Sequence, residues 1–408
     1  MNMLYLPHPS ASFPSRSAHT IEHMKMCEAF TRHGVAVRML YHCPPFSHEG
    51  VDLVERVRDF YGLRQTFPVV TLGGWKVRAR WLRATHLDSA SMAATTALYV
   101  MWGGLAGRLS RRDVIYSRNR AVAAALVWLL GVLPAARRPK VVYEVHEPED
   151  HAFRLLAPGL AGIVTISEQL RDHLCVDFGV SRSVITVERC AVDTEQFTAA
   201  TIPRADARRR LGLPSNGAPI VAYCGRIDAS RGVDVLIRAA RRFSEHGWYC
   251  MLIGGSADDA RRLPGVEEIP PCVIFAGAVS PANVPVWLSA ADVLVAPPAN
   301  RGQYDRGASP LKLFEYMAAQ RPIVSTRVPA VEKIVTDTEH AVLVEPGSPD
   351  DLVRGISWVL EHPCEARGMV ARAWMLAERH TWVDRARRIL RFIDGLPERG
   401  AAAEVIHA

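Results

Sequence analysis

Short apolar runs alternate with amphipathic segments along both halves of the chain. Helices fit between several of these runs, for example at residues 20–32, 232–245, 282–290 and 310–320. Strand candidates in the first half are MNMLYLP, AVRMLYH, PVVTL, VIYSR, VVYEVH and GIVTIS, and in the second half PIVAYCGR, WYCMLIGG, VIFAGAV, VLVAPP, PIVST and AVLVEP. This alternation predicts an α/β fold with parallel sheets that helices cover on both faces.

A polar stretch between Thr201 and Pro219, TIPRADARRRLGLPSNGAP, interrupts this rhythm and suggests a domain boundary. The 408 residues suffice for two domains that each bury a core. We therefore predict two Rossmann-like domains, residues 1–200 and 201–375, and a helical tail, 376–408, that packs back towards the first. Ligands of such sheets bind outside the carboxyl ends of the strands, so a cleft between facing sheets would let both domains contribute.

Composition narrows the class of ligand. The net charge of +7 is modest beside 42 acidic residues, and we find no zinc-finger spacing, no aromatic RNA-binding signature and no basic tail. Nucleic acid is therefore not the expected partner, whereas a phosphate ligand or an anionic membrane surface fits. The eight cysteines are scattered without a C-x-x-C pair, and the start, MNMLYLPHP, does not resemble a signal peptide, so a reducing cytoplasmic location is expected.

The longest apolar run, Ala121 to Ala136, is too short to span a membrane and contains Gly131 and Pro134, which favours a buried helix. A second stretch, GGWKVRARWLRATHL at residues 73–87, combines tryptophan with arginine. This stretch fits either peripheral contact with an anionic membrane or an amphipathic helix whose arginines lie on its solvent-exposed face.

The segment SPLKLFEYMAAQR places a lysine where a helix least favours one. Ser309 followed by Pro310 predicts a helix start in which the serine hydroxyl caps the free N–H groups. Lys312 would then stand near the third helical position, where the helix dipole disfavours a cation by about 0.3–1 kcal/mol. A bound anion would reverse that preference.

A second basic strand-to-helix junction, CGRIDASRGVDVLIRAA, lies upstream in the same half of the chain. Gly225 permits a tight turn, and Arg226 and Arg231 would point towards the ligand edge of the sheet. Together with Lys312 and the helix N-terminus these cations suit a diphosphate. The alternative is that each is a solvated surface charge, with Glu315 a surface partner of Lys312 rather than a ligand of a hydroxyl group.

Several segments in order resemble the family 4 (GT-B) retaining glycosyltransferases. In the second half these are CGRIDASRGVDVLIRAA, VIFAGAVSPANVPVWLSAADVLVAPP, SPLKLFEYMAAQRPIVST and EHAVLVEPGSPDDLVRGI, and in the first half VIYSRN, VVYEVHEPED, GIVTISEQLRDHL and VITVERCAVDTEQF. The tail, ERHTWVDRARRIL, also resembles that family, so the resemblance covers nearly the whole chain.

The resemblance implies a role for each matching residue. It assigns Arg226 and Arg231 to the donor diphosphate, Glu315 to the ribose, and His146 to the neighbourhood of the donor sugar, where we count it with the two arginines as catalytic. The first glutamate of the family's E-x7-E motif is absent, because Gly307 stands there, and we read this as a variant donor site. Further donor contacts are expected from Gly225, Ser309, Pro310, Leu311, Lys312, Ala278 and Val279, with Tyr304 or Asp305 replacing the missing glutamate, and acceptor or diphosphate contacts from Arg16, Ser17 and His19.

The implied reaction is transfer of a sugar from a nucleotide diphosphate sugar, UDP favoured over GDP or ADP, to a carbohydrate, lipid-linked or small-molecule acceptor, as in polysaccharide biosynthesis. It proceeds with retention of the anomeric configuration of the sugar, and it needs no metal and no cofactor beyond the donor. Two alternatives stay open: a catalytically impaired glycosyltransferase-like partner protein and a GT-B sugar-nucleotide epimerase.

Overall fold

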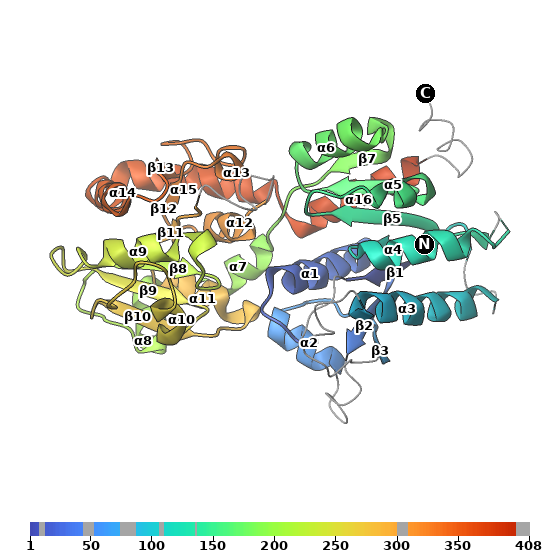
Figure 1. The fold of residues 1–408 in the computed structure, drawn as a ribbon. Helices are drawn as coiled ribbons and strands as arrows, with labels where there is room; N and C mark the ends of the chain where they lie inside the picture. The colour runs from blue at the N-terminus through green and yellow to red at the C-terminus, as the bar shows by residue number, and fades with distance from the viewer. Residues whose placement is uncertain are drawn as a thin grey trace. The chain divides into compact units, whose positions relative to one another are not determined.

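The strands of the computed structural model pair in parallel in two separate sheets, which the chain forms in two units (Figure 1). The model describes residues 1–7, 13–43, 53–73, 87–105, 110–134, 137–299 and 309–396. Met1–Arg189 and the segment from Trp382 form the first unit, and Cys190–Thr381 forms the second. The predicted α/β class with parallel sheets is confirmed.

The sheet of the first unit has the order β3-β2-β1-β4-β5-β6-β7. Its strands are β1 (Asn2–Leu6), β2 (Ala36–Cys43), β3 (Val69–Gly73), β4 (Val114–Ser117), β5 (Lys140–Val145), β6 (Gly162–Thr165) and β7 (Ile185–Val187). Its helices are α1 (Ala18–Arg32), α2 (Leu53–Tyr61), α3 (Leu87–Leu105), α4 (Arg120–Leu130), α5 (Phe153–Leu156), η3 (Ala157–Gly159), α6 (Glu168–Phe178), η4 (Arg182–Val184) and α16 (Trp382–Gly395).

The sheet of the second unit has the order β10-β9-β8-β11-β12-β13. Its strands are β8 (Ile220–Cys224), β9 (Tyr249–Ile253), β10 (Val273–Gly277), β11 (Val293–Ala296), β12 (Ile323–Thr326) and β13 (Val342–Val344). Its helices are α7 (Thr194–Ala200), α8 (Arg204–Leu211), η5 (Ala229–Arg231), α9 (Val233–Ala240), α10 (Ala257–Arg261), η6 (Pro281–Asn283), α11 (Val284–Ser289), α12 (Leu311–Ala318), α13 (Pro329–Glu332), α14 (Pro349–Glu361) and α15 (Pro363–Glu378).

Both faces of the second sheet are buried, which explains why its strands are continuous apolar runs. Along β8, Ile220 and Ala222 join one core cluster whereas Val221 and Tyr223 join another. Successive side chains of a strand point to opposite faces, so the two clusters lie on the two sides of the sheet. Polar groups can therefore gather only at the ends of the strands.

All the strands are parallel, but in each sheet the order in which the chain adds them switches sides beside the first strand of the unit. In the first unit the chain builds outward from β1 to β2 and β3, then returns to place β4 on the other side of β1. The second unit repeats this with β8 between β9 and β11. Such a switch point opens a crevice outside the carboxyl ends of the two adjacent strands, which is where open α/β sheets bind ligands.

The unit boundaries differ from those predicted at 200/201 and 375/376. Cys190–Ala200 belongs to the second unit, because the Cys190 N–H donates to Ser309 Oγ (2.9 Å) and Phe197 is buried in that unit's core. The tail joins the first unit only from Trp382, and α16 contacts α1 there. Packing thus places the first boundary before the polar stretch that the sequence suggested, and the second one six residues later than expected, after Thr381.

Helix α4, which covers most of the apolar run from Ala121, is buried on one side only. Val122 and Leu126 are in the core, but Trp128 is 74% exposed. The expected buried helix is therefore buried along one face only, because α4 packs on the sheet and on α3 while its remaining face has no cover among the described residues. No helix within the described ranges is long and apolar enough to cross a membrane.

Tyr316 attaches α12 to the carboxyl end of the second sheet. Its hydroxyl accepts the N–H of Cys224 at the end of β8 (2.7 Å) and donates to the carbonyl of Val295 in β11 (3.3 Å). The side chain is fully buried. One hydroxyl thus fixes the helix against both strands that flank the switch point.

We expect Tyr316→Phe to lower the free energy of unfolding by about 1–3 kcal/mol, because it leaves a buried backbone N–H without its acceptor. Chemical denaturation of the variant and of Tyr249→Phe, a half-buried tyrosine of the adjacent strand, measures the difference. Equal losses in the two variants would contradict a special role for the Tyr316 hydroxyl.

Candidate functional site

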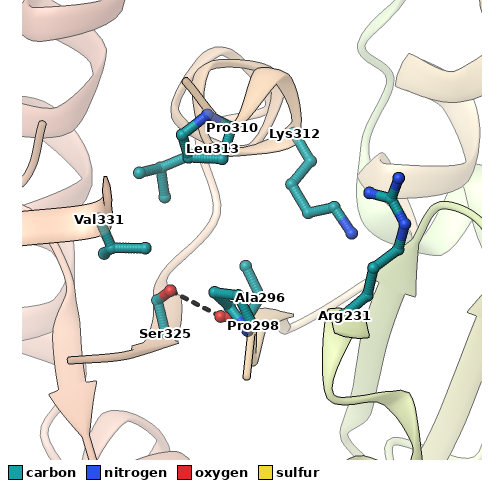
Figure 2. A pocket seen from close by; sticks show the side chains of 8 residues that line it. All are labelled: Arg231, Ala296, Pro298, Pro310, Lys312, Leu313, Ser325 and Val331. Atoms are coloured by element: carbon teal, nitrogen blue, oxygen red, sulfur yellow. Dashed lines mark hydrogen bonds between the residues drawn. The ribbon is translucent and has the colours of Figure 1, made fainter. Parts of the chain in front are cut away.

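The second switch point brings Arg231 and Lys312 together. Figure 2 shows the Lys312 side chain, from the start of α12, and the Arg231 side chain, at the end of η5, pointing toward one another at a pocket. The pocket is lined by Arg231, Ala296, Pro298, Pro310, Lys312, Leu313, Ser325 and Val331. The basic junctions that the sequence singled out therefore supply two cations to one hollow.

The Lys312 ammonium lies against Tyr223 and Gly225 rather than against a carboxylate. Its Nζ donates to the Tyr223 hydroxyl (2.8 Å) and sits 4.0 Å from the centre of that ring, and the Tyr223 hydroxyl in turn donates to the Arg226 carbonyl (2.9 Å). Within the described ranges Lys312 forms no ion pair. Burial, and then the charge of Arg231, lower the pKa of Lys312 to about 7.

Gly225 makes this contact possible. Its φ is +145°, and a Cβ there would lie 3.0 Å from Lys312 Nζ and 3.0 Å from the Tyr223 hydroxyl. Any side chain would therefore push the lysine away. Gly225 also donates its N–H to Ile253 at the end of β9 (2.8 Å), which fixes the turn to the sheet edge.

Arg231 carries a buried donor that remains unused. Its Nε has no hydrogen-bond partner among the described residues, although such an atom costs free energy when left unpaired. The residue is held by η5, whose first turn is capped by Asp228: that carboxylate accepts the N–H of Ser230 (2.8 Å). An arginine donor and an ammonium group at one pocket are suited to an oxyanion.

Arg226 is placed differently from the other two cations. Its side chain is 71% exposed and lies 3.5 Å from an oxygen of Asp228, and it does not line the pocket. Glu315 is half-buried on the first two turns of α12. Ala278 is exposed and Val279 half-buried just after β10, at the same edge of the sheet.

The helix start differs from the expected one. Helix α12 begins at Leu311, with Pro310 rather than Ser309 at the cap, and no side chain caps it. Ser309 stands one residue before the cap position, and its hydroxyl accepts the Cys190 N–H (2.9 Å). The first N–H groups of α12 thus lack a side-chain cap, and Lys312 stands at the second helical position. Tyr304, Asp305 and Gly307 lie outside the described residues.

A second polar cluster occupies the switch point of the first sheet. Arg118 follows β4, His146 follows β5, and Glu22 and His19 come from the first turns of α1. Arg118 donates to Glu22 Oε2 (2.8 Å), to His146 Nδ1 (2.8 Å) and to His19 Nδ1 (3.3 Å). Burial, and then Arg118, lower the pKa of His146, so its imidazole is neutral.

The spacing of this cluster also resembles that of a metal site. One ligand atom each from His19, Glu22 and His146 lies within 4.8 Å of the others. The guanidinium of Arg118 already donates to all three, so it supplies the positive charge that a metal ion would bring.

Of the predicted loop residues, His19 belongs to this cluster, Arg16 is exposed above the Phe60 ring, and Ser17 precedes α1 without capping it by its side chain.

Sequence reasoning missed the residues that organise both sites. Tyr223 and Tyr316 read as strand and helix core, and Arg118 stood within a matched segment, VIYSRN, without a role. Arg118 had a detectable signal, since it is a cation directly after an apolar strand. The two tyrosines had none, because their hydroxyl partners are backbone groups or residues far away in the chain.

Comparison with solved structures gives the class of the fold. Sucrose-phosphate synthase from Thermosynechococcus elongatus superimposes with a TM-score of 0.73 at 18% identity, covering 97% of this chain and 99% of that one. The Anabaena protein HepE in complex with UDP-glucose gives a TM-score of 0.69 at 14% identity, covering 97% and 100%. The chain therefore has the GT-B fold.

Sequence comparison then gives the family. Residues 218–362 match the family model described as Glycosyl transferases group 1. The 2-deoxystreptamine glucosyltransferase of Streptomyces kanamyceticus is 25% identical over 337 residues, which are 80% of this chain and 81% of the relative. Over residues 218–362 the chain matches the group 1 glycosyltransferases, and this agrees with the resemblance seen in its sequence.

Lys312 should make stability depend on pH with a defined sign. With a pKa of about 7 in the folded protein and an ordinary value of 10.5 in the unfolded chain, the unfolded state binds more protons between those limits. Stability then rises with pH across that window. We expect Lys312→Met to be more stable than the wild type at about pH 6, by a margin that shrinks towards about pH 9.

Urea denaturation at several pH values measures this margin, with Lys333→Met, an exposed lysine of the same unit, as the control. If Lys312→Met and the wild type show parallel pH dependence, the pKa of Lys312 is not lowered in the folded protein.

Proposed function

We propose that this glycosyltransferase moves a sugar, with retention, from a nucleotide diphosphate sugar to a hydroxyl group of a carbohydrate, lipid-linked or small-molecule acceptor. The observation that carries the proposal is the convergence of Lys312 and Arg231, two cations without a carboxylate partner in the described ranges, on one pocket at a switch point. Half-buried cations without counter-charges are costly, so a bound anion would stabilise the site.

A donor diphosphate fits this arrangement in three respects. Arg231 offers an unused buried N–H, Lys312 offers an ammonium group, and the start of α12 offers backbone N–H groups that no side chain caps. The exposed Arg226 side chain, directly after β8, is available for a further phosphate contact. Glu315, on the same helix, would accept hydroxyl groups of the ribose.

The same groups would carry the chemistry. Negative charge builds up on the departing diphosphate as the bond to the sugar breaks, and preorganised cations stabilise that charge in the transition state. The acceptor hydroxyl attacks from the face that the diphosphate leaves and gives its proton to the departing phosphate oxygen, so the configuration is retained. No metal and no cofactor other than the donor takes part in this proposal.

UDP-glucose is the first donor to test. The HepE structure contains UDP-glucose, and the Streptomyces kanamyceticus relative is named a glucosyltransferase. Because that relative is named for 2-deoxystreptamine, this compound is a reasonable first small-molecule acceptor. A cytoplasmic location follows from the proposed donor, which cells make in that compartment.

We expect one nucleoside diphosphate to raise the unfolding temperature of the wild type. A ligand at 100 times its dissociation constant adds about 2.7 kcal/mol to stability. Arg231→Ala and Glu315→Ala should lose most of that shift, whereas Arg242→Ala, an arginine of the same unit that pairs with Asp350, should keep it. Thermal scans with UDP, GDP and ADP measure the effect.

If no diphosphate stabilises the wild type, the proposed donor site is wrong. If a diphosphate binds but UDP-glucose and acceptor give no transfer, the impaired-partner alternative is favoured. Conversion of the sugar nucleotide to an isomer without an acceptor would favour the epimerase.

We also propose that the first unit contacts an anionic membrane through the open face of α3 and α4. Residues 74–86 lie outside the described residues, so the tryptophan- and arginine-rich segment itself is not placed. Helices α3 and α4 contact each other (Figure 1), and Trp102 and Trp128 on them are 63% and 74% exposed. Exposed arginines follow both helices, at Arg111, Arg112 and Arg137, and this combination suits an acidic lipid surface.

We expect the protein to float with phosphatidylglycerol vesicles and the double variant Trp102→Ser, Trp128→Ser to float much less. Val176→Ser, which removes an exposed apolar side chain from α6, is the matched control. A wild type that stays with the unbound fraction would rule out this contact without affecting the donor proposal.

A further inference from the structure

The first unit contains a buried carboxylate, Glu144, that links His146 to Arg385 on α16. Glu144 lies on β5, two residues before His146, and is 3% exposed. Its Oε1 accepts from both His146 Nε2 (2.7 Å) and Arg385 Nη2 (2.7 Å), and its Oε2 accepts from the Tyr116 hydroxyl (2.5 Å). Both oxygens of the carboxylate are therefore engaged.

Two neighbours fix the protonation state of the His146 ring. A guanidinium can only donate, so Nδ1 must accept the hydrogen bond from Arg118. An ionised carboxylate can only accept, so Nε2 must carry the proton that points to Glu144. The result is a neutral imidazole in one tautomer, which both neighbours require.

Arg385 is the cation that keeps Glu144 ionised from the other side. Burial by itself would raise the pKa of Glu144, but Arg385 and then Arg118 outweigh it and hold that pKa well below its usual range. Arg385 is 2% exposed and is held in place by the carbonyls of Arg189 (2.9 Å) and Glu188 (3.1 Å). It comes from α16, which follows the whole second unit in the sequence.

We propose that Arg385 is a positioning residue of the transferase: through Glu144 it holds the His146 ring in one orientation and one tautomer at the carboxyl end of β5. The C-terminal helix α16 is then a part of the site of the first unit. The inference rests on the proposed function only in treating His146 as part of the sugar-handling site; the geometry of the relay stands without it.

Charged and titratable groups face His146 from every element around it. They are Arg118 after β4, His19 and Glu22 on α1, Glu144 on β5, and, through Glu144, Tyr116 on β4 and Arg385 on α16. Removing the Arg385 charge leaves the negative charge of Glu144 less compensated, which favours an imidazolium. Removing the Glu144 charge leaves His146 near the positive charges of Arg118 and Arg385, which disfavours the imidazolium form of His146.

The test compares variants in which these two charges are removed separately. In nitrogen-15 NMR of labelled histidine side chains, with the His146 signal assigned by its loss in His146→Gln, the wild type should show Nε2 protonated. Arg385→Gln should raise the pKa of His146 by about one unit or more, and Glu144→Gln should lower it. Arg388→Gln, on the same helix and paired with the Glu188 carboxylate (2.9 Å), should leave it unchanged.

Opposite shifts in the two variants support the relay, because simple loosening of the structure would move both towards the ordinary value. Equal shifts in both, or no shift in Arg385→Gln, would overturn it. If Arg385→Gln does not fold, the lowered pKa of His146 in Glu144→Gln still decides whether the Glu144 carboxylate controls the ring. This readout needs no donor, so it is independent of whether a nucleoside diphosphate binds.

With a known donor, the pH profile of the transferase activity gives a second test of Arg385. Arg385→Gln should lose activity at the acidic side of the pH profile, where its His146 becomes protonated, with little change in the KM for the donor. Arg388→Gln should keep the wild-type profile. A uniform loss of activity at all pH values would assign Arg385 a structural role only.

Discussion

The burial of both faces of each parallel sheet governs where this protein can hold charge. Backbone groups of the strands are used up within the sheets, and the alternating side chains of strands such as β8 are divided between two apolar cores. A polar group in such a unit must therefore sit at a strand end or on the outer surface. The switch points beside β1 and β8 are the places where strand ends also leave room for a ligand.

The two switch points resolve the cost of buried charge in different ways. In the first unit each buried arginine meets a carboxylate, with Arg118 on Glu22 and Arg385 on Glu144. In the second unit Lys312 meets only a tyrosine ring and hydroxyl, and the Nε of Arg231 meets nothing within the described residues. The first arrangement is complete by itself, whereas the second leaves cationic groups for the anion that we propose as its ligand.

Much of the architecture could be predicted from the sequence, because it depends on local patterns. The apolar runs correctly marked the strands except β7, Ile185–Val187, which has only three residues and polar residues nearby on both sides. The pairing of Lys312 with Arg231 was also predictable, since both follow strands that topology places side by side. The capping role of Ser309 was not, because the Cys190 N–H that occupies its hydroxyl comes from a distant segment. The Glu144–Arg385 pair spans 241 positions, and no local pattern indicates it.

The return of α16 to the first unit has a consequence for how the chain is made. Residues 1–189 leave the ribosome well before Trp382, and the whole second unit is synthesised in between. Until α16 has been synthesised, Glu144 lacks the Arg385 guanidinium that pairs with it in the folded protein. A chain that ends before α16 would keep that carboxylate in its first unit with Arg118 as its nearest remaining arginine. The first unit can therefore bury Glu144 with its Arg385 partner only after α16 has been synthesised.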